Sequence, residues 1–179
     1  MPRLFTGLEI PADLGQALAL KRGALRGSRW IEPSDYHITL RFLGDVDAEV
    51  AEALHAALAE ARPRAPFTLT LDGLASFGGD KPRALLATVA PSADLTALQA
   101  EHERLARRAG AAPEPRKFTP HVTLARLRRE ASAADVAAYL GERGLFVPLT
   151  FTVTRVALFS ARDSTGGGPY VVEAAYPLE

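Results

Sequence analysis

Short segments in which apolar and polar residues alternate recur along the whole chain. The clearest runs from Tyr36 to Leu43 and ends at Gly44. A period of two predicts a strand with one face in a core and the other face open. We expect strands over residues 4–10, 36–43, 67–71, 84–90, 121–127, 149–160 and 169–175, the last two pairing across a loop of three glycines at 166–168.

Between these strands, apolar residues recur at helical spacing. Asp47, Ser92 and Ser132 stand where an N-cap is expected, because such side chains accept hydrogen bonds from the free amides of a first turn. Since the strands alternate and do not form doubly buried runs, the pattern favours an α+β fold with largely antiparallel sheets, each with one open face. We expect helices over residues 12–25, 47–61, 92–109 and 132–140.

One longer pattern repeats at nearly half the chain length. Residues 12–18 resemble residues 93–98, and each segment precedes a His-x-Thr-Leu strand, at His37 and at His121. The offsets are 81 residues for the first pair of segments and 84 for the histidines. The recurrence predicts a duplicated strand–helix–strand unit. The alternative is two ordinary strand-to-helix transitions in an alanine-rich chain.

Charge and composition narrow the function classes. The chain has 21 Lys and Arg against 21 Asp and Glu, so it lacks the basic excess of a protein that coats nucleic acid. Only three of the basic residues are lysines, and arginine binds phosphate in a bidentate way that lysine cannot. The absence of cysteine excludes disulfides and thiolate chemistry and fits the cytoplasm. The chain has no signal-peptide pattern and no membrane-length apolar run, and its 179 residues suit one domain.

Two of the four histidines share one tetrapeptide pattern, His37-Ile38-Thr39-Leu40 and His121-Val122-Thr123-Leu124. On a strand, His37 and Thr39 lie on one face and the aliphatic residues on the other, and the same holds for His121 and Thr123. Two such strands facing each other across a pseudo-two-fold axis would bring two imidazoles and two hydroxyls around one cleft. The imidazoles can divide the roles of acid and base, and the hydroxyls can bind phosphate oxygens.

A less specific interpretation exists for each histidine. A single His-x-Thr is common on half-exposed strands, so only the paired copies indicate chemistry. His102 lies at helical spacing with leucines and is expected to pack in a core, and His55 is expected on a half-exposed helix face. Both are expected to be dispensable for chemistry. The residues indicate no metal site, because no Cys, helical His pair or acidic cluster accompanies the motifs.

These motifs and their flanks resemble the two-histidine phosphoesterase superfamily, and specifically the bacterial and archaeal RNA 2′,3′-cyclic phosphodiesterases, also called 2′-5′ RNA ligases. The resemblance covers essentially the whole chain. It rests on the opening strand, on the two motif segments and on the last hairpin, at residues 3–11, 29–44, 118–126, 158–160 and 169–170.

The resemblance implies a single bilobal domain over residues 1–179, with two mainly antiparallel sheets related by a pseudo-two-fold axis around a central cleft and helices outside. It implies a monomeric enzyme without metal or cofactor that hydrolyses an RNA-terminal 2′,3′-cyclic phosphate to a 2′-phosphate. His37 would then be the acid and His121 the base, with Thr39 and Thr123 on the phosphate oxygens. The near-symmetry of the motifs leaves that direction open, and the resemblance also implies a reversible 2′-5′ ligase activity.

Side chains beside the motifs are further candidates. Arg41 shares the parity of His37 and Thr39, so we expect it near the substrate phosphate. Arg126 has the opposite parity to His121, and only a bulge or the strand end would turn it to the site that the resemblance assigns to it. Phe5 and Phe42 are candidates for base stacking, although the parity of Phe42 favours core packing. Trp30 is also expected in the core.

Two alternatives to an RNA-end enzyme remain. One is a phosphodiesterase that acts on a small cyclic phosphate or cyclic nucleotide. The other is a non-catalytic module that binds RNA ends. Charge distribution bears on this choice, because residues 104–129 hold eight basic side chains against one acid, while residues 45–60 hold five acids and no Lys or Arg. We expect the basic residues around His121 to guide an RNA end.

Overall fold

The structure is a computed structural model that describes residues 3–143, 145–161 and 168–179. These residues form both strands and helices, as the α+β prediction requires. In chain order, the elements are β1 (Arg3–Glu9), α1 (Ala12–Ala19), β2 (Ser28–Trp30), the 3-10 turn η1 (Pro33–Asp35), β3 (His37–Asp45), α2 (Ala48–Ala59), β4 (Phe67–Phe77), β5 (Ala84–Val89), α3 (Ala93–Arg108), β6 (His121–Leu127), α4 (Ala133–Glu142), β7 (Leu149–Val153), β8 (Arg155–Ser160) and β9 (Val171–Pro177).

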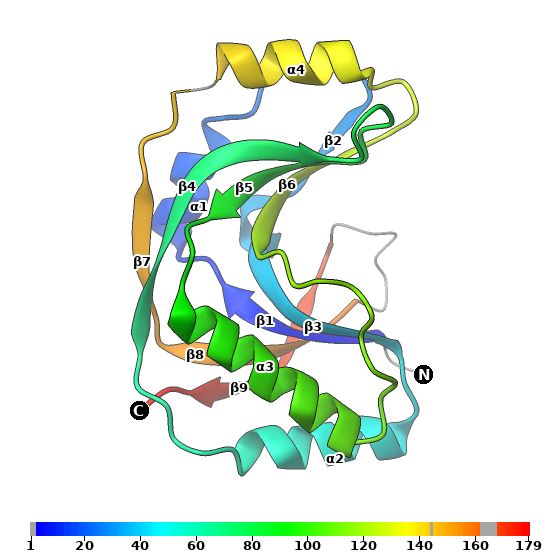
Figure 1. Ribbon diagram of the computed structural model, residues 1–179, viewed down its shortest axis with the longest axis vertical. Coiled ribbons are helices and arrows are strands. Elements are labelled where there is room, and N and C mark those ends of the chain that lie inside the picture. Colours follow the sequence, from blue (N-terminus) through cyan, green and yellow to red (C-terminus); the bar gives the residue numbers. More distant parts are fainter. Residues whose placement is uncertain (1–2, 144, 162–167) are drawn as a thin grey trace.

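All strand pairs are antiparallel, in the order β7-β4-β5-β6-β3-β1-β8-β9. The short strand β2 pairs with β6 on the edge opposite β5, which is also the edge that β3 uses. The two histidine strands, β3 and β6, lie side by side in the middle of this order (Figure 1). Three further strands continue the sheet on each side of them. This symmetric order is what a repeated strand–helix–strand unit around a two-fold axis would produce.

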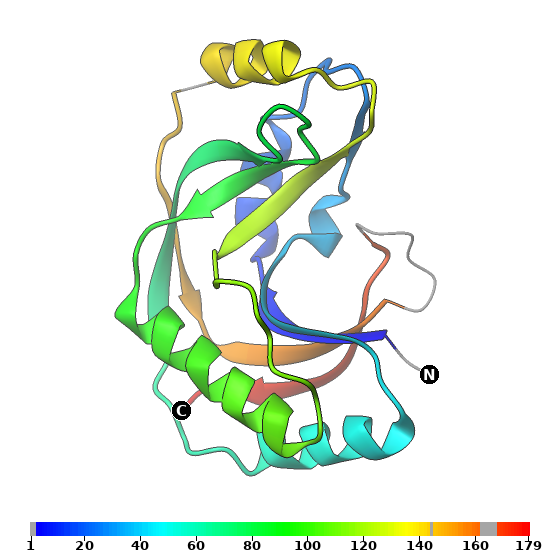
Figure 2. The same cartoon turned by 45° about the vertical axis from the view of Figure 1, so that its right-hand side comes forward.

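The two expected sheets are joined in one hydrogen-bonded path. The link is narrow, because β3 and β6 share the single Cα pair Ile38 and Val122. Both side chains are completely buried. The prediction of two separate sheets is therefore corrected to one strongly bent sheet whose halves meet at this apolar pair. Figure 2 shows the strands of the two halves diverging.

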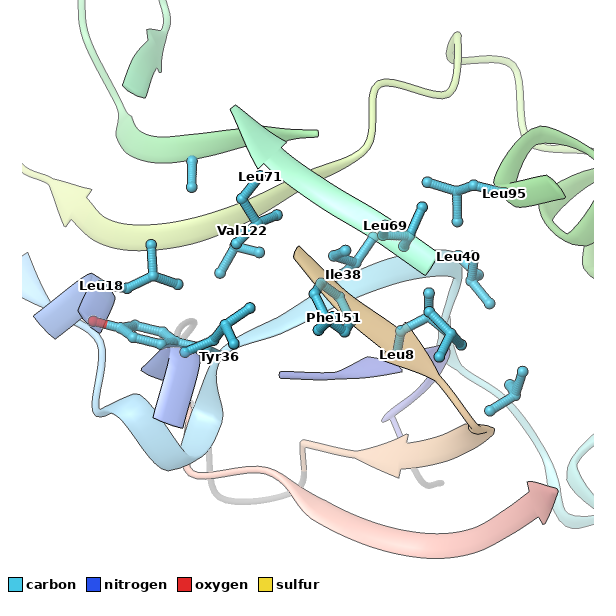
Figure 3. Close-up of a cluster of buried hydrophobic side chains, with 14 of the residues drawn as sticks. Leu8, Leu18, Tyr36, Ile38, Leu40, Leu69, Leu71, Leu95, Val122 and Phe151 are labelled. Carbon is cyan, nitrogen blue, oxygen red and sulfur yellow. The ribbon is translucent and has the colours of Figure 1, made fainter. Parts of the chain in front are cut away.

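The main core lies on the face of the sheet that Ile38 and Val122 share. Leu18 of α1 and Leu95 of α3 pack there with strand residues from both halves of the sheet (Figure 3). Further along α3, Leu105 packs with residues of α2, β1 and β8. The helices thus cover one face and leave the other face for the polar members of the motifs.

Local sequence signals set most element boundaries. Asp47, Ser92 and Ser132 each accept a hydrogen bond from the backbone amide three residues on, which confirms the three predicted N-caps. The predicted helix over residues 12–25 is too long, since α1 ends at Ala19. The predicted strand over residues 149–160 is two strands separated at Thr154, one in each half of the sheet.

The sequence did not predict β2, whose three residues are held by pairing with β6. The predicted hairpin of β8 with β9 is confirmed, whereas glycines 166 and 167 of its loop lie outside the described residues. None of the helices in the described part of the chain is long and apolar enough to cross a bilayer.

Candidate active site

Each motif histidine is held by the carbonyl oxygen of the residue two positions before it. Nδ1 of His37 lies 2.9 Å from the oxygen of Asp35, and Nδ1 of His121 lies 2.7 Å from that of Thr119. A carbonyl only accepts hydrogen bonds, so both Nδ1 atoms carry the proton and donate it. In the neutral rings, Nε2 is therefore the unprotonated atom that can take a proton from a substrate or water.

Aromatic rings surround His37. Its ring centroid lies 4.8 Å from that of Phe5, 5.6 Å from that of Phe159 and 4.9 Å from that of Tyr170. Nε2 of His37 lies 3.0 Å from the hydroxyl of Thr39, which donates to it when the ring is neutral. Burial lowers the pKa of His37 to about 4, against the opposing effect of the Asp35 carbonyl, so the free protein holds this ring neutral at pH 7.

His121 has a more open environment. The ring of Phe77 contacts the His121 ring edge-on, with 4.7 Å between the two ring centroids. Burial lowers the pKa of His121, the hydrogen bond to Thr119 raises it, and the positive charge of Arg126 lowers it further. The charge of His121 also lowers the pKa of His37. The two imidazoles thus interact electrostatically across the Ile38–Val122 pair.

A register shift interrupts each histidine strand at the same place in its motif. In β3 the extra residue is Leu40, and in β6 it is Leu124. Such a bulge shifts the alternation by one residue, so side chains beyond it change faces. Both strands consequently share one burial pattern, in which two consecutive buried residues precede an exposed one, Phe42 or Arg126.

The bulge in β6 brings Arg126 to the face of His121 and Thr123. Its charge lowers the pKa of both motif histidines, which places its electrostatic influence at the site. The simple alternation of the sequence gave Arg126 the opposite face. The structure thus brings together five of the six side chains proposed from the sequence, namely His37, Thr39, His121, Thr123 and Arg126.

The sixth side chain, Arg41, is not part of this group. The bulge at Leu40 turns it to the helix-covered face, where it is 5% exposed and forms an ion pair with Glu103 of α3. It also donates to the carbonyl oxygens of Phe42 and Ala112. The prediction that Arg41 meets a phosphate is wrong, because the parity argument assumed an unbroken strand.

The same bulge reverses the prediction for Phe42, and burial overturns the stacking prediction for Phe5. Phe42 is 42% exposed on the histidine face, where the alternation predicted core packing. Phe5 is buried beneath His37, Phe159 and Tyr170, so its ring has no free surface for a base. Trp30 is partly buried and packs against the core, as expected.

The other two histidines lie outside the site. His102 is buried, with Nδ1 2.8 Å from the Thr6 hydroxyl, which confirms its packing role. His55 is exposed and shares a hydrogen bond of 2.7 Å with the hydroxyl of Tyr176. Over the described ranges, no group of three or more His, Asp or Glu side chains is placed to hold a metal ion.

Comparison with known proteins agrees with this geometry. A model of the 2′-5′ RNA ligase superfamily matches residues 15–165, which include both His-x-Thr motifs. The chain belongs to the 2′-5′ RNA ligase superfamily. The resemblance seen in the motifs is thereby confirmed.

Individual members of the superfamily match over most of the chain. The RNA 2′,3′-cyclic phosphodiesterase of Bacillus subtilis (strain 168) is 30% identical over 168 residues, covering 91% of this chain and 86% of that protein. The protein of the same name from Aeropyrum pernix is 36% identical over 116 residues, which are 64% of this chain and 65% of that protein, slightly less than two thirds. The crystal structure of Escherichia coli LigT complexed with 3′-AMP has a TM-score of 0.77 at 25% identity and covers 99% of each chain.

Proposed function

We propose that the protein hydrolyses the 2′,3′-cyclic phosphate at the end of an RNA and leaves a 2′-phosphate. The observation that carries the proposal is the pair of imidazoles, His37 and His121, each tied through Nδ1 so that Nε2 is the reactive nitrogen. The names of its superfamily relatives, RNA 2′,3′-cyclic phosphodiesterases, support the same substrate. The crystallisation of Escherichia coli LigT with 3′-AMP supports a site for a nucleotide phosphate.

In the proposed reaction, Nε2 of His121 takes a proton from a water molecule as the water oxygen attacks phosphorus. The bond from phosphorus to the 3′ oxygen breaks, and Nε2 of His37 gives that oxygen a proton. The hydroxyls of Thr39 and Thr123 donate to the non-bridging oxygens, and Arg126 balances the charge that develops on them. One imidazole gains a proton and the other loses one, so exchange with solvent restores the starting state.

The acid must be protonated before the reaction, yet burial in the free protein favours neutral His37. A bound cyclic phosphate carries a negative charge next to the ring, and an opposite charge favours the protonated form. We therefore expect the pKa of His37 to rise when the substrate binds. A cyclic phosphate with sulfur as the 3′ leaving atom needs little protonation, so it should restore turnover to His37→Ala but not to His121→Ala.

The exposed ring of Phe42 supports a contact with the terminal base, because aromatic rings stack on any base. The same steps, with the 5′ hydroxyl of a second RNA in place of water as the nucleophile, join two ends through a 2′-5′ bond as the bond to the 3′ oxygen breaks. Ligation thus uses the same two histidines in the same roles as the proposed hydrolysis, with a different nucleophile.

Both motifs come from one chain, which supports a monomer as the active form and residues 1–179 as one domain with a repeated unit. We place it in the cytoplasm on the basis of its proposed RNA substrate and its lack of cysteine. Sedimentation at assay concentration tests the monomer, and a stable dimer would contradict it.

The test of the function is a turnover assay in EDTA with an oligoribonucleotide that ends in a 2′,3′-cyclic phosphate. The proposal predicts conversion to a 2′-phosphate, identified by its resistance to a 3′-specific phosphatase. Turnover confined to cyclic mononucleotides would show a small-molecule enzyme. Tight binding of the RNA end without turnover would show a binding module, and either result contradicts the proposal.

A further inference from the structure

A second arginine lies directly across from Arg126 on the neighbouring strand. The pairing of β2 with β6 sets Arg29 opposite Arg126 and Trp30 opposite Ala125. Opposite residues of an antiparallel pair point to the same face. Trp30 and Ala125 both pack in the core, so Arg29 and Arg126 share the histidine face.

The same cross-strand row continues in the other direction. Ala84 of β5 is opposite Arg126, and Phe77 of β4 is opposite Ala84. Phe77 contacts the ring of His121, which ties the row to the proposed catalytic pair. Arg29 therefore lies on the far side of Arg126 from Phe77, one strand spacing (about 4.8 Å) beyond it.

Arg29 and Arg126 occupy opposite positions in the sheet, and no described acidic side chain pairs with either of them. In the described part of the chain, neither Arg29 nor Arg126 forms an ion pair or a side-chain hydrogen bond. Like charges directly opposite each other on a sheet are destabilising, so this arrangement is suited to an anionic ligand that lies against both.

The strand that carries Arg29 is short but firmly held. Trp30 packs against the ring of Tyr139 at a centroid distance of 5.9 Å, and the amide of Ile31 donates to the carbonyl of Leu124 at 2.9 Å. Arg22 donates to the carbonyl of Ile31. Arg29 is thus presented from a fixed backbone position, which lowers the entropic cost of binding a ligand.

We infer that Arg29 binds the phosphodiester on the 5′ side of the terminal nucleotide, while Arg126 serves the cyclic phosphate. This inference rests on the proposed function and extends it to the substrate class. A nucleoside cyclic phosphate with a free 5′ hydroxyl lacks that second phosphate, whereas every RNA end longer than one nucleotide has it. Arg29 is therefore the residue that favours an oligonucleotide over a mononucleotide.

The test compares a diribonucleotide ending in a 2′,3′-cyclic phosphate with the corresponding mononucleotide. Arg29→Ala should raise KM for the dinucleotide about 10-fold, the effect of losing one charged hydrogen-bonding partner, and leave kcat unchanged. The mononucleotide should show no change in either constant. Arg29→Lys should fall between wild type and alanine, because it keeps the charge and loses the fork.

The matched control is Arg26→Ala, which removes an exposed arginine three residues earlier and outside the row. Arg26→Ala should leave KM and kcat unchanged for both substrates. With a longer oligonucleotide, Arg29→Ala should also reduce the slope of log KM against log salt by about 0.7, the share of one phosphate contact on a single strand.

An equal rise in KM for both substrates, or no rise for either, would overturn the inference and leave the proposed function standing. A wild-type protein that turns over neither substrate would contradict the proposed function, and the inference with it. Thermal unfolding of Arg29→Ala identifies a purely structural role. A destabilised β2 would lower the melting temperature and impair turnover of both substrates together.

Discussion

Phe42 and Arg126 lie at the same place in the two histidine strands, five residues after His37 and His121 respectively. Both are exposed on the histidine face, because the same bulge precedes each of them. The two halves of the sheet thus contribute the same backbone shape but different chemistry. One half presents an aromatic ring and the other a guanidinium, which suits a ligand with a base at one end and phosphate charge at the other.

Replacing Arg126 should affect catalysis without affecting folding. Arg126→Ala should lower kcat/KM about 100-fold or more, the effect of removing one donor from a developing oxyanion. The melting temperature should stay close to that of the wild type, since the side chain is exposed. Arg126→Ala with unimpaired kcat/KM would show that its charge does not act on the substrate.

Replacing Arg41 should affect the stability of the fold, in contrast to replacing Arg126. Its guanidinium is buried against Glu103, so Arg41→Ala leaves a carboxylate without its buried partner and should lower the free energy of unfolding by about 3–5 kcal/mol. Urea unfolding measures this loss. The control is Arg107→Ala, which removes a 54% exposed partner of the same carboxylate and should cost less than about 1 kcal/mol. A stable Arg41→Ala protein with impaired substrate binding would restore the original prediction for Arg41.

The contrast between these arginines shows where sequence reasoning succeeded and failed. Period-two alternation identified the strands and the site-facing residues of the motifs, because that pattern is local. These residues are His37, Thr39, His121 and Thr123. The bulges at Leu40 and Leu124 depend on how β3 and β6 pair with their neighbours, which the chain pattern does not specify. Beyond each bulge the parity argument therefore gave the wrong face.

Other errors also came from tertiary contacts. The helical pattern after Ala12 continues in the sequence to residue 25, but α1 stops at Ala19 and the chain turns to reach β2. There the hydroxyl of Tyr139 donates to the carbonyl of Lys21 and holds the turn against α4. The strand β2 itself has three residues, too few for alternation to reveal.

Phe42 should act on substrate binding. Phe42→Ala should raise KM about 5- to 100-fold, the range expected when one base loses a stacking partner, with kcat little changed. Phe42→Tyr keeps a ring of similar area and should retain the wild-type KM. Equal KM values for wild type and Phe42→Ala would mean that the exposed ring contacts no base.

Stability should decline on mild acidification. Burial lowers the pKa of both His37 and His102 to about 4, below the ordinary value of 6.5. Between these values the unfolded chain binds more protons than the folded one, so the free energy of unfolding falls as the pH falls from about 6.5 to 4. His102→Gln should be less stable overall yet flatten this slope by up to about 1.4 kcal/mol per pH unit. Urea unfolding across this range measures it, and an unchanged slope would contradict a neutral buried His102.

Single-turnover rates of the histidine variants show whether His37 and His121 act together as acid and base. With a cyclic-phosphate-ended oligoribonucleotide in EDTA, His37→Ala and His121→Ala should each be slower than wild type by about 10²–10⁴-fold. The double variant should be little slower than the worse single one, because the pair acts as a unit. His55→Ala, an exposed histidine outside the site, should react like the wild type. Full activity of His121→Ala would contradict the account.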